Sequence, residues 1–166
     1  MGRLSVLALL AAGVALAAAP AASAPRASNT FAPGVALGAA RLGMTKAEIL
    51  RTWGKKHGVC RDCRRETWYF NKHAFQPQGT GVVFRDGRAV QLFTVWKPDG
   101  WSTRQGVALG AEGGDVGSTY GELATHRCRG YQALVLRGKR AESVFYVYSG
   151  DVWAFGLQRH GLNPCL

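Results

Sequence analysis

The feature that most constrains the fold of this chain is a short segment that returns in altered form 67 positions later. Residues 41–54 read Arg-Leu-Gly-Met-Thr-Lys-Ala-Glu-Ile-Leu-Arg-Thr-Trp-Gly, and residues 108–121 read Ala-Leu-Gly-Ala-Glu-Gly-Gly-Asp-Val-Gly-Ser-Thr-Tyr-Gly. Both copies have Leu-Gly near the start and an aromatic residue followed by Gly at the end. Two copies of one structural unit explain this most simply. We therefore predict a first unit over 34–96, a linker over 97–105 and a second unit over 106–166.

The first 24 residues have the pattern of a cleavable signal peptide. Arg3 precedes an apolar run from Leu4 to Ala19, and residues 22–24 read Ala-Ser-Ala, a small-residue cleavage site. A membrane anchor, the alternative, needs a longer apolar run. Residues 25–33, rich in Ala, Ser, Asn and Pro, are expected to form a disordered leader. With no cysteine at the expected mature start, the sequence predicts a secreted or periplasmic protein without a lipid anchor.

The first unit is expected to begin with a helix over residues 46–53. Thr45 and Glu48 fit a Thr-x-x-Glu capping box, and Gly54 is a typical residue to end the helix. The pattern then predicts strands at 66–71, 81–86 and 88–96. The last two are expected to form a hairpin that turns at Asp86-Gly87, the dipeptide that a type I′ turn prefers. Strict alternation from that turn puts Leu92 on the face of Val83, and Phe93 on the face of Val82.

The second unit is expected to have an irregular helix at about 112–120, because its three glycines disfavour helix. Strands are predicted at 130–137, 143–149 and 152–159. Alternation there brings four aromatic residues to one face: Tyr146, Tyr148, Trp153 and Phe155. Because Tyr and Trp dominate protein interfaces, these four are our candidate partner-binding residues. The alternative is that this face is core beneath a helix.

A strongly basic composition points to a second candidate surface. Removal of the signal peptide takes away Arg3 and leaves 20 basic and 10 acidic residues, a net charge of +10. Six cations cluster in and after the first predicted helix: Arg51, Lys55, Lys56, Arg61, Arg64 and Arg65. Such a patch favours an anionic envelope polymer, a lipid or nucleic acid as partner. The alternative is a solvated loop without a partner.

The four cysteines are expected to form two disulfides, for which three pairings are possible. We favour Cys60 with Cys63 and Cys128 with Cys165. A redox Cys-x-x-Cys and a zinc site are the alternatives, the latter with donors Cys60, Cys63, His57 and His73.

These motifs together resemble secreted bacterial proteins with tandem β-lactamase-inhibitory-protein-like units, and a single unit is similar to the BamE (SmpA/OmlA) module. The resemblance rests on Leu-Gly-Met-Thr-Lys-Ala-Glu-Ile ending in Trp-Gly, on the Asp-Gly-Arg hairpin, and on residues 103–121. It implies an α+β fold in which two units of helical segment plus antiparallel sheet form one curved, helix-backed sheet. It also implies a monomer that binds a protein of the envelope or extracellular space through the open sheet face, without catalysis.

Catalytic motifs are missing from the sequence. It contains no Gly-x-Ser-x-Gly elbow, Walker loop or dinucleotide fingerprint. We therefore expect a protein that is not an enzyme and that needs no cofactor or metal.

Overall fold

The computed structural model describes residues 29–73 and 76–166, and most of its regular structure is strand. Strands account for 46% of the described residues and helices for 12%. In chain order the elements are β1 (Thr30–Ala32), β2 (Ala36–Leu37), α1 (Lys46–Trp53), β3 (Gly58–Val59), β4 (Thr67–His73), β5 (Gln76–Arg85), β6 (Arg88–Val95), β7 (Ser102–Thr103), α2 (Gly113–Tyr120), β8 (Ala124–Cys128), β9 (Tyr131–Arg137), β10 (Glu142–Tyr148) and β11 (Asp151–Gln158). No helix in this described part is long and apolar enough to cross a membrane.

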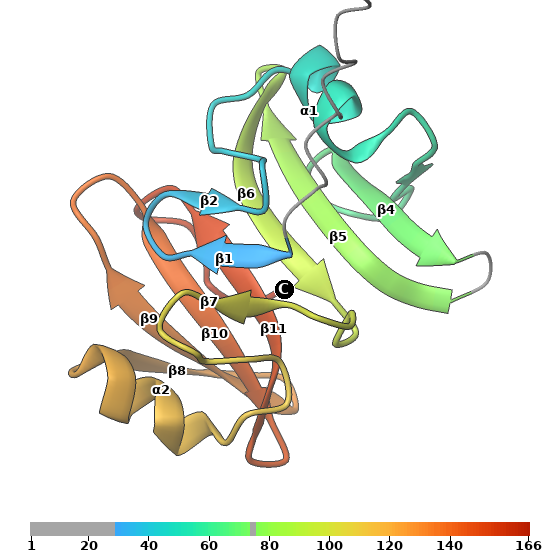
Figure 1. Cartoon of the computed structure of the whole chain (residues 1–166). Helices are drawn as coiled ribbons and strands as arrows, with labels where there is room; N and C mark the ends of the chain where they lie inside the picture. Colours follow the sequence, from blue (N-terminus) through green and yellow to red (C-terminus); the bar gives the residue numbers. More distant parts are fainter. Residues whose placement is uncertain (1–28, 74–75) are drawn as a thin grey trace, which may run out of the picture.

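The main element is an eight-stranded antiparallel sheet in the order β3-β4-β5-β6-β11-β10-β9-β8. Two four-stranded halves therefore meet through their last strands (Figure 1). The junction between β6 and β11 is short, with the pairs Phe93↔Gly156, Leu92↔Leu157 and Gln91↔Gln158. Strands β3 and β8 form the two edges.

A small second sheet, in the order β2-β1-β7, lies over the junction of the two halves (Figure 1). Its strand β1 pairs with β7, 72 positions away in sequence, through Thr30↔Ser102 and Phe31↔Thr103. Phe31 is fully buried in the main core. The leader predicted over 25–33 and the linker over 97–105 thus supply core strands. The predicted signal peptide and residues 25–28 lie outside the described residues.

The predicted α+β, helix-backed sheet was wrong, because the fold is mostly β. Each helix is eight residues long and fully buries one side chain, Ile49 in α1 and Val116 in α2. The small sheet also supplies core residues, through Phe31 and Leu37, as does Trp101, which directly precedes β7. Short strands of this kind carry little periodic signal in a sequence, so sequence patterns do not reveal that they cover the sheet.

The local predictions for α1 were confirmed. The helix spans Lys46–Trp53, and the Thr45 side chain accepts a hydrogen bond from the Glu48 backbone N–H at 3.3 Å. The Glu48 carboxylate in turn accepts from the Thr45 backbone N–H at 2.7 Å. Hydrogen bonding to the Thr45 backbone, and then to its side chain, lowers the pKa of Glu48. The second helix has no side-chain cap, yet it is α-helical over Gly113–Tyr120.

One local arrangement occurs in both halves of the molecule. Before α1, the Gly43 N–H donates to Ala89 in the first hairpin; before α2, the Gly110 N–H donates to Val152 in the second. Both glycines have positive φ, 85° and 96°, which a side chain would disfavour. They are separated by the same 67 residues as the sequence echo. The division into two tandem units by duplication stays a prediction.

Each main hairpin contains one extra residue that strict alternation cannot anticipate. The register shifts between Val83 and Phe84 in the β5–β6 pair, and between Tyr146 and Val147 in the β10–β11 pair. A bulge of this kind moves every later residue to the opposite face. Leu92 therefore lies in the main core and Phe93 on the other face, the reverse of the prediction.

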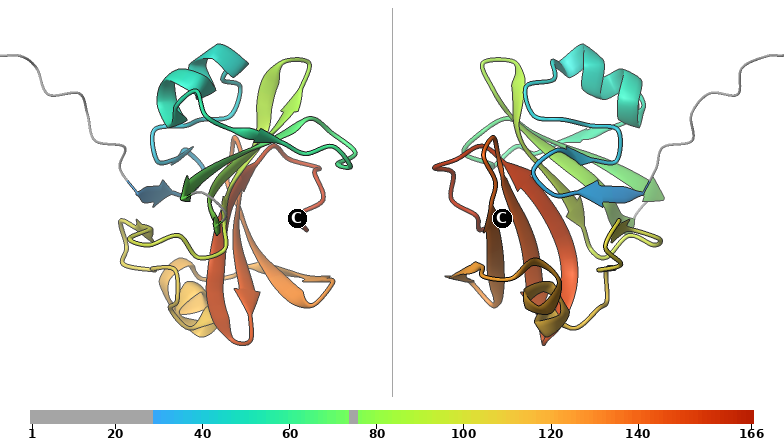
Figure 2. Two further views of the ribbon diagram at one scale, coloured as in Figure 1. Left: turned by 90° about the vertical axis from the view of Figure 1, so that its right-hand side faces the viewer. Right: turned by 60° about the vertical axis from the view of Figure 1, so that its left-hand side comes forward.

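The face of the large sheet opposite the helices is partly covered by the C-terminal segment (Figure 2, left). Cys165 is joined to Cys128 of β8, and Leu162 packs on the group formed by Val83, Val90 and Phe93. The Gln158 side chain donates to the Leu162 carbonyl at 3.0 Å.

Candidate functional site

The clearest candidate site is an open hollow of about 590 Å³ on this second face of the sheet, which we call the aromatic groove. It lies where the end of β6, the β8–β9 turn and the β10–β11 turn come together. Its lining consists of aromatic, basic and turn residues: Trp96, Lys97, Arg129, Gly130, Tyr131, Tyr148, Ser149, Asp151 and Trp153.

Two aromatic side chains of the groove are directed to solvent. Trp96 is 61% exposed and Tyr148 is 59% exposed, unusually high fractions for side chains of this size. The Trp96 ring lies 6.1 Å from that of Trp153, which is half-buried. The groove therefore offers apolar rings to a ligand without any change in conformation.

The backbone that presents Trp96 is conformationally constrained. Trp96 and Lys97 have φ of 55° and 52°, a left-handed conformation that is uncommon for residues with side chains. The Lys97 N–H donates to the Trp153 carbonyl at 3.1 Å, and Lys97 Nζ lies 3.8 Å from a carboxylate oxygen of Asp151. Strained backbone held by such contacts is typical of functional sites.

Tyr131 forms the inner wall of the groove and links it to the C-terminus. Its ring makes an edge-on contact with Trp153, with centroids 5.7 Å apart. Its hydroxyl donates to the Leu166 carbonyl at 3.0 Å and accepts from the Leu166 backbone N–H at 2.6 Å. Burial raises the pKa of Tyr131, so the hydroxyl stays protonated over the physiological range.

Of the four aromatic residues predicted to bind a partner, two line the groove and two are buried. Tyr148 and Trp153 line it. Phe155 is fully buried in the main core, where it stacks on Phe31 with ring centroids 4.9 Å apart. Tyr146 is also fully buried, so the exposed four-residue aromatic face does not exist.

Sequence reasoning missed Trp96 and Tyr131 as groove residues. Trp96 directly follows β6, the last strand of the first half, so only the tertiary fold brings it to Trp153. Tyr131 directly follows the positive-φ Gly130 in the β8–β9 turn. An aromatic residue next to a turn glycine is a weak signal that could have been used.

Tyr146 sits directly beneath the groove. Burial, and then the neighbouring Tyr131, raise its pKa. Its hydroxyl lies beside the Gln91 side chain without a hydrogen bond of ordinary geometry. A Cβ at Gly156 would lie 2.8 Å from this hydroxyl, so glycine is needed there to admit the ring. Tyr146 supports the floor of the groove and is inaccessible to a partner.

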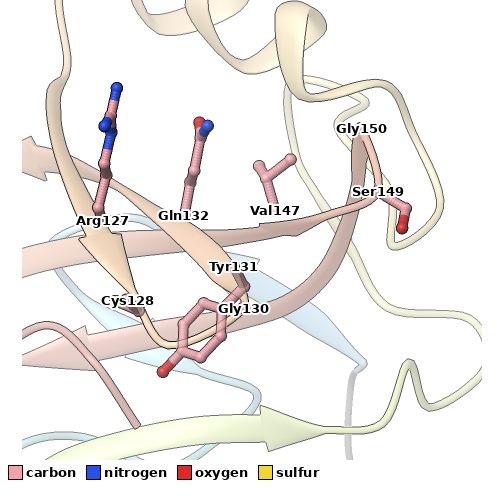
Figure 3. Close-up of a pocket in the computed structure, with 8 residues that line it drawn as sticks. All are labelled: Arg127, Cys128, Gly130, Tyr131, Gln132, Val147, Ser149 and Gly150. Carbon is pink, nitrogen blue, oxygen red and sulfur yellow. The ribbon is translucent and has the colours of Figure 1, made fainter.

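A smaller hollow of about 480 Å³ adjoins the groove at the β8–β9 turn (Figure 3). The side chains of Arg127, Gln132 and Val147 point toward α2, whereas Tyr131 points to the opposite side of the sheet (Figure 3). The two hollows thus share the turn but open on different faces.

The six predicted basic residues are all exposed, in a segment that runs from α1 to the start of β4. None of them forms an ion pair within the described residues. Lys46, in contrast, lies 2.7 Å from Glu66 and sits over the Trp68 ring.

The predicted disulfide pairing was confirmed: Cys60 is bonded to Cys63, and Cys128 to Cys165. Structural disulfides are typical of proteins that mature in an oxidising compartment outside the cytoplasm. The described residues contain no group of three or more side chains placed to hold a metal ion.

Comparisons with known proteins show the fold alone. No protein-family model matches the sequence, and no curated protein matches it. The fold is similar to the crystal structure of a DUF4309 family protein (YjgB) from Bacillus subtilis, with a TM-score of 0.52 and 14% identity, over 69% of this chain and 78% of that one. It is also similar to an extracellular protein containing an SCP domain from Bacillus anthracis, with a TM-score of 0.54 and 10% identity, over 84% of this chain and 50% of that one.

Proposed function

We propose that this protein is a secreted, non-catalytic binding protein that holds a partner protein in the aromatic groove. The observation that carries the proposal is the joint exposure of Trp96 and Tyr148 in one hollow, which the half-buried Trp153 also lines. Exposed large apolar groups that gather in one hollow mark interaction sites, whereas isolated ones need no explanation.

The residue types in the groove fit a protein partner. Trp, Tyr and Arg are enriched among residues that dominate protein binding energy, and the groove has two Trp, two Tyr and Arg129. Its volume of about 590 Å³ is large enough for one or two inserted side chains.

A partner would meet a surface that is largely ordered in advance. Trp96 is fixed by its constrained backbone, Trp153 by contact with Tyr131, and Tyr131 by its two hydrogen bonds to Leu166. Groups that are already immobilised lose little conformational entropy on binding. Export by the predicted signal peptide over residues 1–24 would place the groove in the periplasm or the medium, where such a partner would be found.

The test is capture of a partner from envelope and culture extracts by the immobilised, oxidised protein. A discrete protein should be retained by the wild type and lost on Trp96→Ala and Tyr148→Ala. Because both side chains are exposed, these variants should keep the wild-type Tm.

The matched control is Val35→Ala with Val59→Ala. These residues are 59% and 56% exposed and lie outside the groove. The control variant should capture the partner as well as the wild type does. Loss in the control, or retention by the groove variants, would show that the groove is not the binding site.

A further inference from the structure

A second surface, independent of the groove, consists of six cations without an ion pair within the described residues, in the segment that runs from α1 to the start of β4. We refer to Arg51, Lys55, Lys56, Arg61, Arg64 and Arg65 as the basic surface. The neighbouring carboxylates have other partners, although Arg51 also interacts electrostatically with Glu48 and, after the Thr45 hydrogen bonds, contributes to its lowered pKa. Glu66 pairs with Lys46 and accepts from the Trp68 indole, and Glu48 caps α1. Asp62 is the one carboxylate between residues 55 and 65. The surface therefore carries a large local excess of positive charge.

The segment that carries these cations is held at several points. Gly58 and Val59 form β3 and pair with Tyr69 and Trp68 of β4. The Cys60–Cys63 disulfide closes the turn that follows, and the Cys60 N–H donates to the Thr67 carbonyl at 2.9 Å. A cation cluster on an ordered backbone loses less entropy on binding than one on a free tail.

His57 fixes the other end of the segment. Its ring stacks on Trp68 with centroids 4.1 Å apart, and its Nδ1 lies 2.9 Å from the Lys55 carbonyl. The chain is thereby anchored next to Lys55 and Lys56.

The arrangement of the charges indicates the shape of the ligand. The cations are exposed and come from α1 and from the segment that follows it up to β4, and Lys56 alone among the six lines one of the main hollows of the described structure, a space of about 230 Å³ beside Trp53. A single phosphate group would need converging donors in a hollow. Several exposed charges that do not converge in a hollow instead suit a linear polymer with repeated anionic groups.

The side-chain chemistry indicates a phosphate-bearing polymer. Four of the six cations are Arg, whose planar guanidinium matches phosphate oxygens in bidentate geometry. Nucleic acids bound without sequence preference usually stack their bases on exposed aromatic rings. Among the described residues, the exposed large apolar side chains include none from 51–65 other than Val59. The two rings of this segment, Trp53 and His57, are half-buried, and His57 already stacks on Trp68. The lack of a highly exposed ring favours a polymer without bases.

We propose that the basic surface binds a linear envelope polymer with a phosphodiester backbone, separately from the partner in the aromatic groove. The binding is electrostatic. It depends on the repeated phosphate charges of the polymer and not on a sequence of units. It would hold an exported protein close to the cell surface while the groove remains free.

The test is titration of the oxidised, exported protein into fluorescein-labelled poly(glycerol phosphate), followed by fluorescence anisotropy. With all six cations at phosphates and a slope of about −0.7 per contact, as for single-stranded nucleic acid, raising the salt from about 50 to 200 mM should weaken binding by about 300-fold. No binding, or binding that is insensitive to salt, would overturn the proposal.

Two triple variants that lose the same amount of charge distinguish an effect of the basic surface from an effect of the protein's net charge. Arg61→Gln with Arg64→Gln and Arg65→Gln should weaken binding at least tenfold at about 50 mM salt and halve the salt slope. The control triple Arg137→Gln with Lys139→Gln and Arg140→Gln, on exposed residues at the β9–β10 turn, should change binding less than about threefold. Equal effects of the two triples would overturn the proposal.

Three further arms fix the ligand class. Neutral dextran should not bind, and single-stranded DNA and phosphatidylglycerol vesicles of equal phosphate concentration should bind more weakly than poly(glycerol phosphate). Tighter binding of DNA or vesicles would replace the proposed ligand. The groove variant with Trp96→Ala and Tyr148→Ala should bind the polymer as the wild type does, so this proposal and the proposed function can fail separately.

Discussion

Replacement of Phe155 by Ala tests the corrected strand register directly. Strict alternation places Phe155 on the same face as Tyr148, but the bulge between Tyr146 and Val147 turns it into the main core. Its ring stacks on Phe31 at 4.9 Å and meets Phe145 edge-on at 5.7 Å. Phe155 is fully buried, whereas Tyr148 is 59% exposed.

The expected magnitude follows from these contacts. Truncation of a fully buried Phe to Ala lowers the free energy of unfolding by about 3–5 kcal/mol, and each lost aromatic pair contributes about 0.5–1.5 kcal/mol of such a sum. We expect about 4 kcal/mol for Phe155→Ala, with a Tm about 15 °C lower. Tyr148→Ala should change the free energy of unfolding by less than about 1 kcal/mol.

Urea unfolding followed by circular dichroism measures both variants. The midpoint should fall for Phe155→Ala while the m-value stays constant, which reports a change in stability rather than in the unfolded state. If Phe155→Ala does not fold, Phe155→Leu should still fold and cost about 1–2 kcal/mol. A loss below about 1 kcal/mol for Phe155→Ala, or equal losses for the two positions, would refute the assignment of faces.

Three further predictions concern glycines, disulfides and pH. Gly117→Ala in α2 should raise the free energy of unfolding by about 0.5–1 kcal/mol, since a Cβ there meets nothing within 4 Å. Gly156→Ala should lower it by about 1–3 kcal/mol, because its Cβ would clash with Tyr146. Thermal unfolding of the two variants measures both effects. Replacing Cys128 and Cys165 by Ser should lower the free energy of unfolding by about 4 kcal/mol, against about 2 kcal/mol for Cys60 and Cys63, because the former pair closes the longer loop; equal losses in urea would contradict this. The lowered pKa of Glu48 stabilises the fold above about pH 4.5, and this stabilisation is lost as the pH falls through the folded pKa. Stability measured between about pH 3 and 6 should therefore depend less on pH in Glu48→Gln, and an unchanged profile would exclude a capping role.

Features that depend on a few neighbouring residues could be predicted from the sequence. The capping box of Thr45 and Glu48 defined the start of α1, and Asp86-Gly87 defined the first main hairpin, where both residues have positive φ. The disulfide pairing could also be predicted, with Cys60 joined to its near neighbour Cys63 and Cys128 of the second unit joined to Cys165 near the C-terminus. Each of these rests on a backbone requirement that few residue types satisfy.

Features that depend on distant packing could not be predicted. Strand β1 is three residues long and pairs with two-residue β7, so neither has a period to detect. Each bulge shifts the register by one residue, and these shifts place Leu92, Phe93 and Phe155 on the face opposite to the predicted one. The aromatic groove could not be predicted for the same reason, because Trp96 and Trp153 come from different halves of the sheet.

Hydrogen exchange of the protein with and without its captured partner tests the groove as the binding site most directly. Amides of Trp96 and Lys97, of residues 129–131 and of residues 148–153 should become protected on binding. The helices α1 and α2, on the other face of the large sheet, should exchange as they do in the free protein. Protection confined to the helices or to the small sheet, with the groove unchanged, would contradict the account.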